Sequence, residues 1–263
     1  MTSEVIGDLT AEHHPPTGRP RNLPLLLIHG MWGGAWYWEN YMRFAADAGW
    51  DVWALNLRGH HGSRPVANLG NVSVRDYVTD VGAALDAMGP AVILGHSMGG
   101  LIAQMAATRP DVRAAVFLTS AAPRGIVGLR APTLSRLVRY APAMLARRAF
   151  KVRDADAIAL ILNRMTPAAR AAALERFVPE SGHAALELTL GRLAVNASDV
   201  RCPTLVMAAS DDQITPVAVQ RRIAAKYGAE YMEAAGHAHM LMLEEDWQPP
   251  WRQILDWLAT RAV

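Results

Sequence analysis

Short runs of consecutive apolar residues alternate along the chain with longer stretches in which apolar residues recur every three or four positions. The short runs are typical of strands buried on both faces, and the longer stretches are typical of helices that cover them. Strands are predicted at residues 25–28, 51–57, 91–94, 114–119 and 203–209, with a weaker one at 229–233. Helices are predicted at residues 35–48, 73–88, 216–227 and 247–260, and from residue 98 to about 109. This alternation predicts an α/β fold with a mostly parallel central sheet and helices on both faces.

Two stretches depart from the alternation. Residues 124–196 have no strand pattern, are rich in Ala, Leu and Arg with helical periodicity, and are interrupted by four prolines. We predict that they form a helical cap inserted between two core segments, residues 23–123 and 197–263. Residues 1–22 are polar and proline-rich, and we expect an N-terminal arm that is either loose or a short edge strand.

Composition narrows the class of protein. The chain has 263 residues, of which 51% are hydrophobic and 19% charged, which suits a compact soluble protein with a large core. The net charge of +2 is too small to imply a nucleic-acid partner. Cys202 is the single cysteine, so an internal disulfide is excluded and a reducing compartment is expected. We see neither a signal peptide nor an apolar run approaching 18 residues, and we expect a cytoplasmic protein without a membrane span.

The first part of the predicted cap is strongly basic. Residues 124–153 contain no Asp or Glu, and their eight basic residues are Arg124, Arg130, Arg136, Arg139, Arg147, Arg148, Lys151 and Arg153. Apolar residues lie between these charges at helical spacing. Two interpretations fit this pattern: a solvated amphipathic face, or a lid that meets an anionic substrate or a lipid surface.

The sequence Gly95-His96-Ser97-Met98-Gly99 lies between a predicted strand and a predicted helix. In this context G-x-S-x-G describes a sharp strand-to-helix turn that holds the serine in a strained conformation and exposes its hydroxyl above the sheet edge. The helix N-terminus also favours negative charge at that point. Ser97 is therefore the candidate nucleophile, and the alternative is an ordinary serine in a glycine-rich loop.

A nucleophilic serine needs a base, a group that orients the base, and donors for the oxyanion. A carboxylate is expected just past the end of a strand, and Asp212 follows the strand at residues 203–209. We prefer Asp212 to its neighbour Asp211, which can shape the turn instead. The base is expected to be His239, with His237 as the alternative. A His-x-His pair can bind metal, but no further cluster has metal-ligand spacing, so no metal is expected.

The remaining parts of the site are assigned by position. The backbone N–H of Met98, directly after the nucleophile, is one expected oxyanion donor, and that of Met31, in the loop after the first strong strand, is the other. Trp32 and Trp36 in the same loop are candidates for lining a substrate pocket, although core packing explains each of them as well.

Together these residues resemble the α/β-hydrolase superfamily over nearly the whole chain, with the cap the least matched part. Within the superfamily, three stretches resemble the plant methylesterases and hydroxynitrile lyases: His29-Gly30 with Gly34-Ala35-Trp36, residues 114–118, and His239 followed by Met-Leu-Met-Leu. The resemblance implies Ser97, Asp212 and His239 as the triad. Two departures stand out. The common R-G-H-G turn carries a second histidine at residue 61, and Met240 occupies the position where the lyases carry a lysine.

The predicted function is that of a serine hydrolase that cleaves a small-molecule carboxylic ester through an acyl-enzyme, without metal or organic cofactor. A second hypothesis keeps the site and changes the reaction to C–C lysis, lactone hydrolysis or cofactor-free perhydrolysis. A third is a non-catalytic ligand receptor on the same fold. The sequence leaves the physiological substrate and the oligomeric state open.

Overall fold

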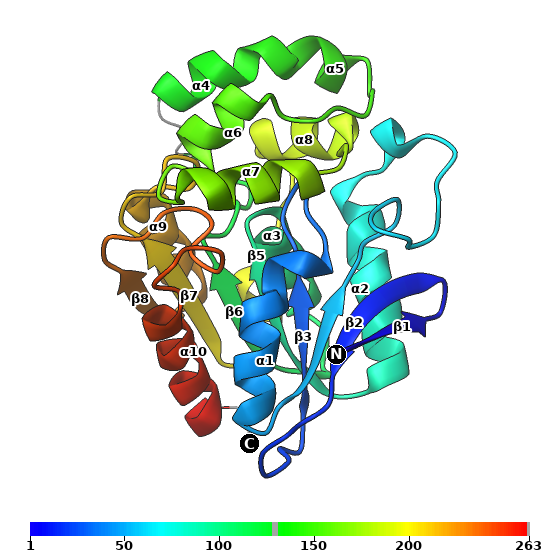
Figure 1. Cartoon of the computed structure of the whole chain (residues 1–263), viewed down its shortest axis with the longest axis vertical. Helices are drawn as coiled ribbons and strands as arrows, with labels where there is room; N and C mark the ends of the chain where they lie inside the picture. The colour runs from blue at the N-terminus through cyan, green and yellow to red at the C-terminus, as the bar shows by residue number, and fades with distance from the viewer. Residues whose placement is uncertain (128–130, 262–263) are drawn as a thin grey trace.

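The computed structural model describes residues 1–127 and 131–261. Residues 128–130, which include Arg130 of the predicted cap, and residues 262–263 at the end of the predicted core lie outside the described residues. Figure 1 shows a central twisted sheet with helices packed on both faces and a further group of helices above one end of the strands. The predicted α/β-hydrolase architecture is confirmed.

Within the described residues, the sheet has eight strands in the order β1-β2-β4-β3-β5-β6-β7-β8. Their bounds are β1 Thr2–Ile6, β2 Leu9–His14, β3 Pro24–Ile28, β4 Asp51–Leu55, β5 Ala91–His96, β6 Val112–Leu118, β7 Thr204–Ala209 and β8 Glu230–Ala234. Strands β3 to β8 pair in parallel, and β1 and β2 are antiparallel to their neighbours. The carboxyl ends of the parallel strands therefore meet at one edge of the sheet, where open α/β folds bind ligands.

The N-terminal segment is more ordered than the sequence suggested. In place of a loose arm or one short strand, β1 and β2 form a hairpin, and β2 pairs with β4. The tight turn uses Gly7 at φ +66°, a conformation that glycine adopts without strain. Leu9 and Ala11 alternate toward the core and are buried, which attaches β2 to the sheet.

Helices cover both faces of the sheet, because successive apolar side chains of each strand point to opposite faces. Leu25 and Leu27 pack into the core on one side, against η1 (Ala35–Trp38), α1 (Glu39–Asp47) and α10 (Gln248–Arg261). Leu26 and Ile28 belong to the core on the other side, which α2 (Val74–Met88), α3 (Met98–Ala106) and α9 (Val217–Tyr227) cover. The helix predicted at residues 35–48 begins with the 3-10 turn η1 and continues as α1. Burial of both faces explains why these strands are almost entirely apolar.

Among the described residues, five α-helices between β6 and β7, with the segments that join them, form the layer above the carboxyl ends of the strands, called the cap below (Figure 1). They are α4 Ala131–Leu137, α5 Ala141–Leu145, α6 Asp154–Leu160, α7 Pro167–Arg176 and α8 Gly182–Thr189. Thr166 and Ser181 begin α7 and α8 by accepting hydrogen bonds from backbone N–H groups of the first turn. In the parts of the chain that the structure describes, no helix is long and apolar enough to cross a bilayer.

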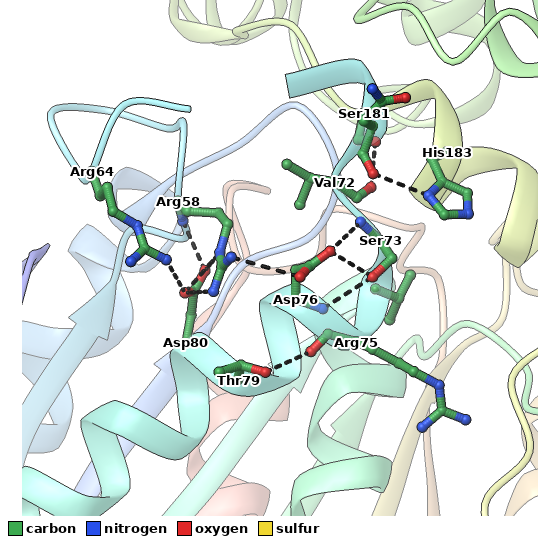
Figure 2. A network of polar contacts seen from close by, with 12 residues as sticks. Arg58, Arg64, Val72, Ser73, Arg75, Asp76, Thr79, Asp80, Ser181 and His183 are labelled. Carbon is green, nitrogen blue, oxygen red and sulfur yellow. Dashed lines mark hydrogen bonds and ion pairs between the residues drawn. The ribbon is translucent and has the colours of Figure 1, made fainter. Parts of the chain in front are cut away.

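A polar network joins the start of α2 to the cap (Figure 2). Ser73 and Asp76 form a reciprocal capping box at the N-terminus of α2. Arg58 holds Asp80 through both carboxylate oxygens, with Nε–Oδ1 at 2.9 Å and Nη2–Oδ1 at 2.7 Å among the contacts. The hydroxyl of Ser181 donates to the carbonyl of Val72 at 2.5 Å, which attaches the first turn of α8 to the core beneath it.

Candidate active site

Ser97 lies in the turn between β5 and α3 with φ +55° and ψ −116°, a conformation that non-glycine residues rarely adopt. The turn is tight enough to exclude side chains on both sides. A Cβ at Gly95 would lie 2.0 Å from the carbonyl oxygen of Gly99, and a Cβ at Gly99 would lie 2.3 Å from that of Ile28. The strained backbone is held because the Ser97 N–H donates to Leu118 O at 3.1 Å.

His239 connects Ser97 to a buried carboxylate. Its Nε2 lies 3.0 Å from the Ser97 hydroxyl, and its Nδ1 lies 2.8 Å from Oδ2 of Asp212. A carboxylate can only accept, so Nδ1 carries the proton and Nε2 is the acceptor for the serine O–H. Of the two histidines that the sequence left open, the structure brings His239 to Ser97.

Asp212 is 2% exposed, and besides His239 it is held by three donors from its own loop. The backbone N–H groups of Ile214 and Thr215 donate to Oδ1, and the Thr215 hydroxyl donates to Oδ2 at 2.7 Å. Burial by itself would raise the pKa of Asp212, but His239 and these hydrogen bonds outweigh it and lower the pKa overall. The neighbouring Asp211 is partly exposed, and its N–H donates to the carbonyl of His237, so it shapes the loop.

His237 is bonded to a different acid. Its Nδ1 lies 2.8 Å from Oε2 of Glu244, and the other carboxylate oxygen accepts from the N–H of Ala238 at 2.9 Å. The hydrogen bond that His237 donates to Glu244 raises the pKa of His237. Asp246 lies near enough for the three to form a potential metal group, but both Glu244 oxygens already accept protein N–H groups. The pair therefore fits a structural brace for the loop that carries His239.

Sequence reasoning did not assign this role to Glu244. The available signal was Glu244 itself, an acidic residue directly after the apolar run Met240–Leu243. In the folded protein Glu244 is only 4% exposed. A buried acid of this kind needs a partner, so it could have indicated a pairing with the nearby His237.

Two further buried histidines hold backbone segments together at the site. His29 donates through Nδ1 to Gly30 O at 2.8 Å and accepts at Nε2 from the N–H of Leu57. Burial, with a contribution from His60, lowers its pKa to about 3. His96 donates through Nε2 to the carbonyl of His239 at 2.9 Å, and burial also lowers its pKa. Both rings are neutral and serve as fixed links between loops.

The two predicted oxyanion donors occupy suitable backbone positions. Met98 is the first residue of α3, so its N–H has no intrahelical acceptor. Met31 follows the end of β3, and a Cβ at the preceding Gly30 would lie 3.0 Å from Cβ of Ser97. The loop carrying Met31 therefore passes directly beside the candidate nucleophile, and Tyr37 fixes it by donating to Met31 O at 2.9 Å.

A cavity of about 440 Å³ extends from Ser97 and His239 into the space between core and cap. Its walls are mainly apolar and include Trp32, Leu137, Met144, Phe150 and Ile161. Of the described residues around it, none is an Asp, Glu, Lys or Arg. Such a cavity accommodates an uncharged, apolar group next to the serine hydroxyl.

Trp36, the second tryptophan expected at the pocket, is not among the described lining residues. Its ring packs at right angles to that of Tyr37, with the centroids 4.6 Å apart, and lies under the guanidinium of Arg176. Tyr37 thus occupies the position at the cavity wall, and Trp36 is a core residue behind it.

The basic face of the cap is partly neutralised. Arg136 and Arg139 each place a guanidinium nitrogen 3.1 Å from Asp156, which is fully buried and lies beyond the acid-free stretch in sequence. Tyr140 donates to the same carboxylate. These two arginines therefore stabilise the cap internally, whereas Arg147 and Arg148 are exposed.

The chain belongs to the Alpha/beta hydrolase family, whose model matches residues 25–249. It is 28% identical over 248 residues to the pimeloyl-[acyl-carrier protein] methyl ester esterase of Neisseria meningitidis, covering 88% of this chain and 92% of that protein. It is 36% identical over 125 residues to the esterase PIR7B of Oryza sativa, covering 44% and 46%. A structure of a thermophilic esterase from Thermogutta terrifontis superimposes with a TM-score of 0.74 at 18% identity, covering 97% and 95% of the two chains.

Proposed function

We propose that this protein is a serine hydrolase that cleaves carboxylic esters through an acyl-enzyme intermediate. The observation that carries the proposal is the continuous hydrogen-bonded series from the Ser97 hydroxyl through His239 to Asp212, which faces an uncharged cavity. Each member has the chemistry that its place requires: a hydroxyl, an imidazole with an accepting Nε2, and a buried ionised carboxylate. Family membership and the esterases among its relatives support the same reaction class.

The reaction follows from these contacts. Ser97 Oγ bonds to the ester carbonyl carbon while its proton passes to Nε2 of His239, and the carbonyl oxygen becomes an oxyanion near the N–H groups of Met31 and Met98. The C–O bond to the alcohol then breaks, and His239 gives its proton to the departing oxygen. Water attacks the acyl-enzyme with His239 again as base, which releases the acid and restores the serine. Asp212 stabilises the imidazolium in both halves.

The substrate that fits best is a neutral ester with an apolar acyl or alcohol group. A charged group in the cavity would lose its hydration without gaining an ionic partner among the described lining residues. Within the resemblance to plant methylesterases and hydroxynitrile lyases, we assign the chain to the esterase side. Met240 lines the cavity where the lyases carry a lysine, so cyanohydrin cleavage lacks its cationic group.

Labelling with a fluorophosphonate followed by intact-mass measurement tests the proposal. We expect one adduct per chain in the wild type and in Ser198→Ala, since the exposed Ser198 hydroxyl donates to Asp199 and not to a histidine. We expect no adduct and no ester turnover in Ser97→Ala, which should keep its fold. Equal labelling of the Ser97→Ala variant, or an unlabelled wild type on folded protein, would refute an activated Ser97.

A further inference from the structure

Trp32 has a strained backbone directly beside the candidate oxyanion donor Met31. Its φ is +61°, in the left-handed region that a bulky side chain seldom occupies. Strain of this kind persists only where surrounding contacts hold it, and it concentrates at functional sites. The contacts that hold Trp32 therefore constrain the chain directly after Met31, whose carbonyl is held by Tyr37.

Two of these contacts come from the cap. The backbone N–H of Val178 donates to Trp32 O at 3.0 Å, and the indole N–H of Trp32 donates to Phe150 O at 3.2 Å. The rings of Trp32 and Phe150 meet edge to face, with their centroids 5.9 Å apart. Main chain and side chain of Trp32 are thus both bound by cap residues, although the loop itself belongs to the core.

The cap residues that hold Trp32 are themselves anchored in the core. Phe150 and Glu180 form a two-hydrogen-bond backbone bridge, at 3.0 and 2.9 Å. The Glu180 side chain is fully buried and accepts from the Tyr77 hydroxyl at 2.6 Å. Its other oxygen lies 3.2 Å from Nε2 of His60, which is also buried. A buried carboxylate with these partners gives the bridge one defined position.

The same anchor also approaches the other side of Met31. The His60 ring lies 5.2 Å from that of His29, whose Nδ1–H donates to the carbonyl of Gly30. The peptide group that contains the Met31 N–H is therefore held by His29, whose ring contacts His60. On the other side of Met31, Trp32 is held by Phe150, the bridge partner of Glu180. A cap that moved away would release Trp32 and remove the partner of His60 together.

We propose that the Phe150–Glu180 bridge sets the position of the Met31 N–H, so that seating of the cap and completion of the oxyanion hole are one event. Trp32 and Glu180 are then positioning residues that act through Met31. This inference rests on the proposed function, because it assigns a role in transition-state stabilisation. We expect loss of this positioning to lower kcat, since an oxyanion donor acts mainly on charge that develops in the transition state.

Trp32→Phe tests the contact, because it removes the indole N–H and keeps an aromatic ring. Trp38→Phe is the matched control: it lies in the adjoining η1, is fully buried, and its indole N–H has no protein partner among the described residues. On a short p-nitrophenyl ester we expect Trp32→Phe to lower kcat about tenfold with KM within about twofold, since small misplacement of a catalytic group is costly. Trp38→Phe should keep kcat within about twofold. Equal kcat losses in the two variants would overturn the proposal.

Glu180→Gln tests the anchor from a residue that does not line the cavity. We expect a similar loss of kcat, and a double variant with Trp32→Phe that loses much less than the product of the two single losses. Multiplicative losses would mean that the two residues act independently, against the proposal. If Glu180→Gln fails to fold, the comparison of Trp32→Phe with Trp38→Phe still decides.

Hydrogen–deuterium exchange separates this inference from the proposed function. In Trp32→Phe we expect faster exchange both in residues 29–38 and in cap residues 147–181, with residues 91–96 of β5 unchanged. Faster exchange in residues 29–38 alone would overturn the coupling. A wild type that neither labels at Ser97 nor turns over the ester would refute the esterase function, and the exchange data would still show whether cap and loop are linked.

Discussion

The Nδ1 atom of His239 lies 2.8 Å from Oδ2 of Asp212, across 27 residues of sequence, while the adjacent Asp211 makes no such contact among the described residues. The pair is positioned by two loops that follow β7 and β8, which are parallel neighbours in the sheet. Parallel pairing brings the carboxyl ends of these strands together, so the acid and the base meet at the same edge.

Asp212→Asn should lower kcat for ester hydrolysis by about 10⁴-fold with little loss of fold, because an amide N–H facing Nδ1 favours the wrong imidazole tautomer. Asp211→Asn is the matched control and should stay within about twofold, since its partly exposed side chain serves the turn. Steady-state kinetics on one ester, with thermal unfolding of each variant, provide the measurement. A larger loss in Asp211→Asn than in Asp212→Asn would reverse the assignment.

The His237–Glu244 pair predicts a pH-dependent contribution to stability. The hydrogen bond that His237 donates to Glu244 raises the pKa of His237 in the folded state. The stabilisation from this pair is therefore fully present below the unfolded pKa near 6.5 and is lost as pH rises through the folded pKa. The difference in unfolding free energy between wild type and His237→Gln should therefore be larger at pH 6 than at pH 9 in urea titrations.

Asp246→Asn serves as the control for this series. Its carboxylate lies 3.8 Å from His237 and is 68% exposed, so solvent screens it and the pH dependence should stay close to that of the wild type. A difference for His237→Gln that grows toward pH 9 would show that the pair does not stabilise the folded state in its charged form.

Gly99→Ala should destabilise the protein by about 3 kcal/mol or more, because the added Cβ would meet backbone carbonyl oxygens of Ile28 and His29 at 2.3 and 2.4 Å. Gly82→Ala is the matched control in the middle of α2, where the nearest atom is a side-chain nitrogen at 3.5 Å. It should stabilise by about 0.5–1 kcal/mol, as alanine does in a helix interior. Urea unfolding of the two variants should thus shift in opposite directions.

Much of the fold could be predicted from local pattern. The runs at residues 25–28, 91–94 and 203–209 became central strands because nothing but burial on both faces accommodates four or more consecutive apolar residues of this kind. The hairpin of β1 and β2 was less accessible to prediction, because only Ile6, Leu9 and Ala11 of its two strands are buried and most of the other residues are polar. An edge strand is defined by its neighbour as much as by its own residues.

The site divides in the same way. Ser97 could be assigned from its glycine-flanked turn, because the turn depends on residues adjacent in the sequence that have no room for a Cβ. His239 and His237 are chemically alike and two residues apart, so only the direction of each side chain distinguishes them. The structure brings His239 to Ser97 and Asp212, and His237 to Glu244. Their catalytic roles stay predictions that the labelling and variant kinetics test.

The sequence by itself determined the α/β class, the strand-to-helix turn at Ser97 and the loops that carry an acid and a base. Each of these depends on periodicity or on the steric demands of neighbouring residues. Only the tertiary structure decided which histidine meets the serine, that Tyr37 and not Trp36 faces the cavity, and that Trp32 is held by Phe150 and Val178. These are contacts between residues far apart in the sequence, 142 positions for Ser97 and His239. Such contacts follow from the packing of the cap and the strand ends, which no local pattern encodes.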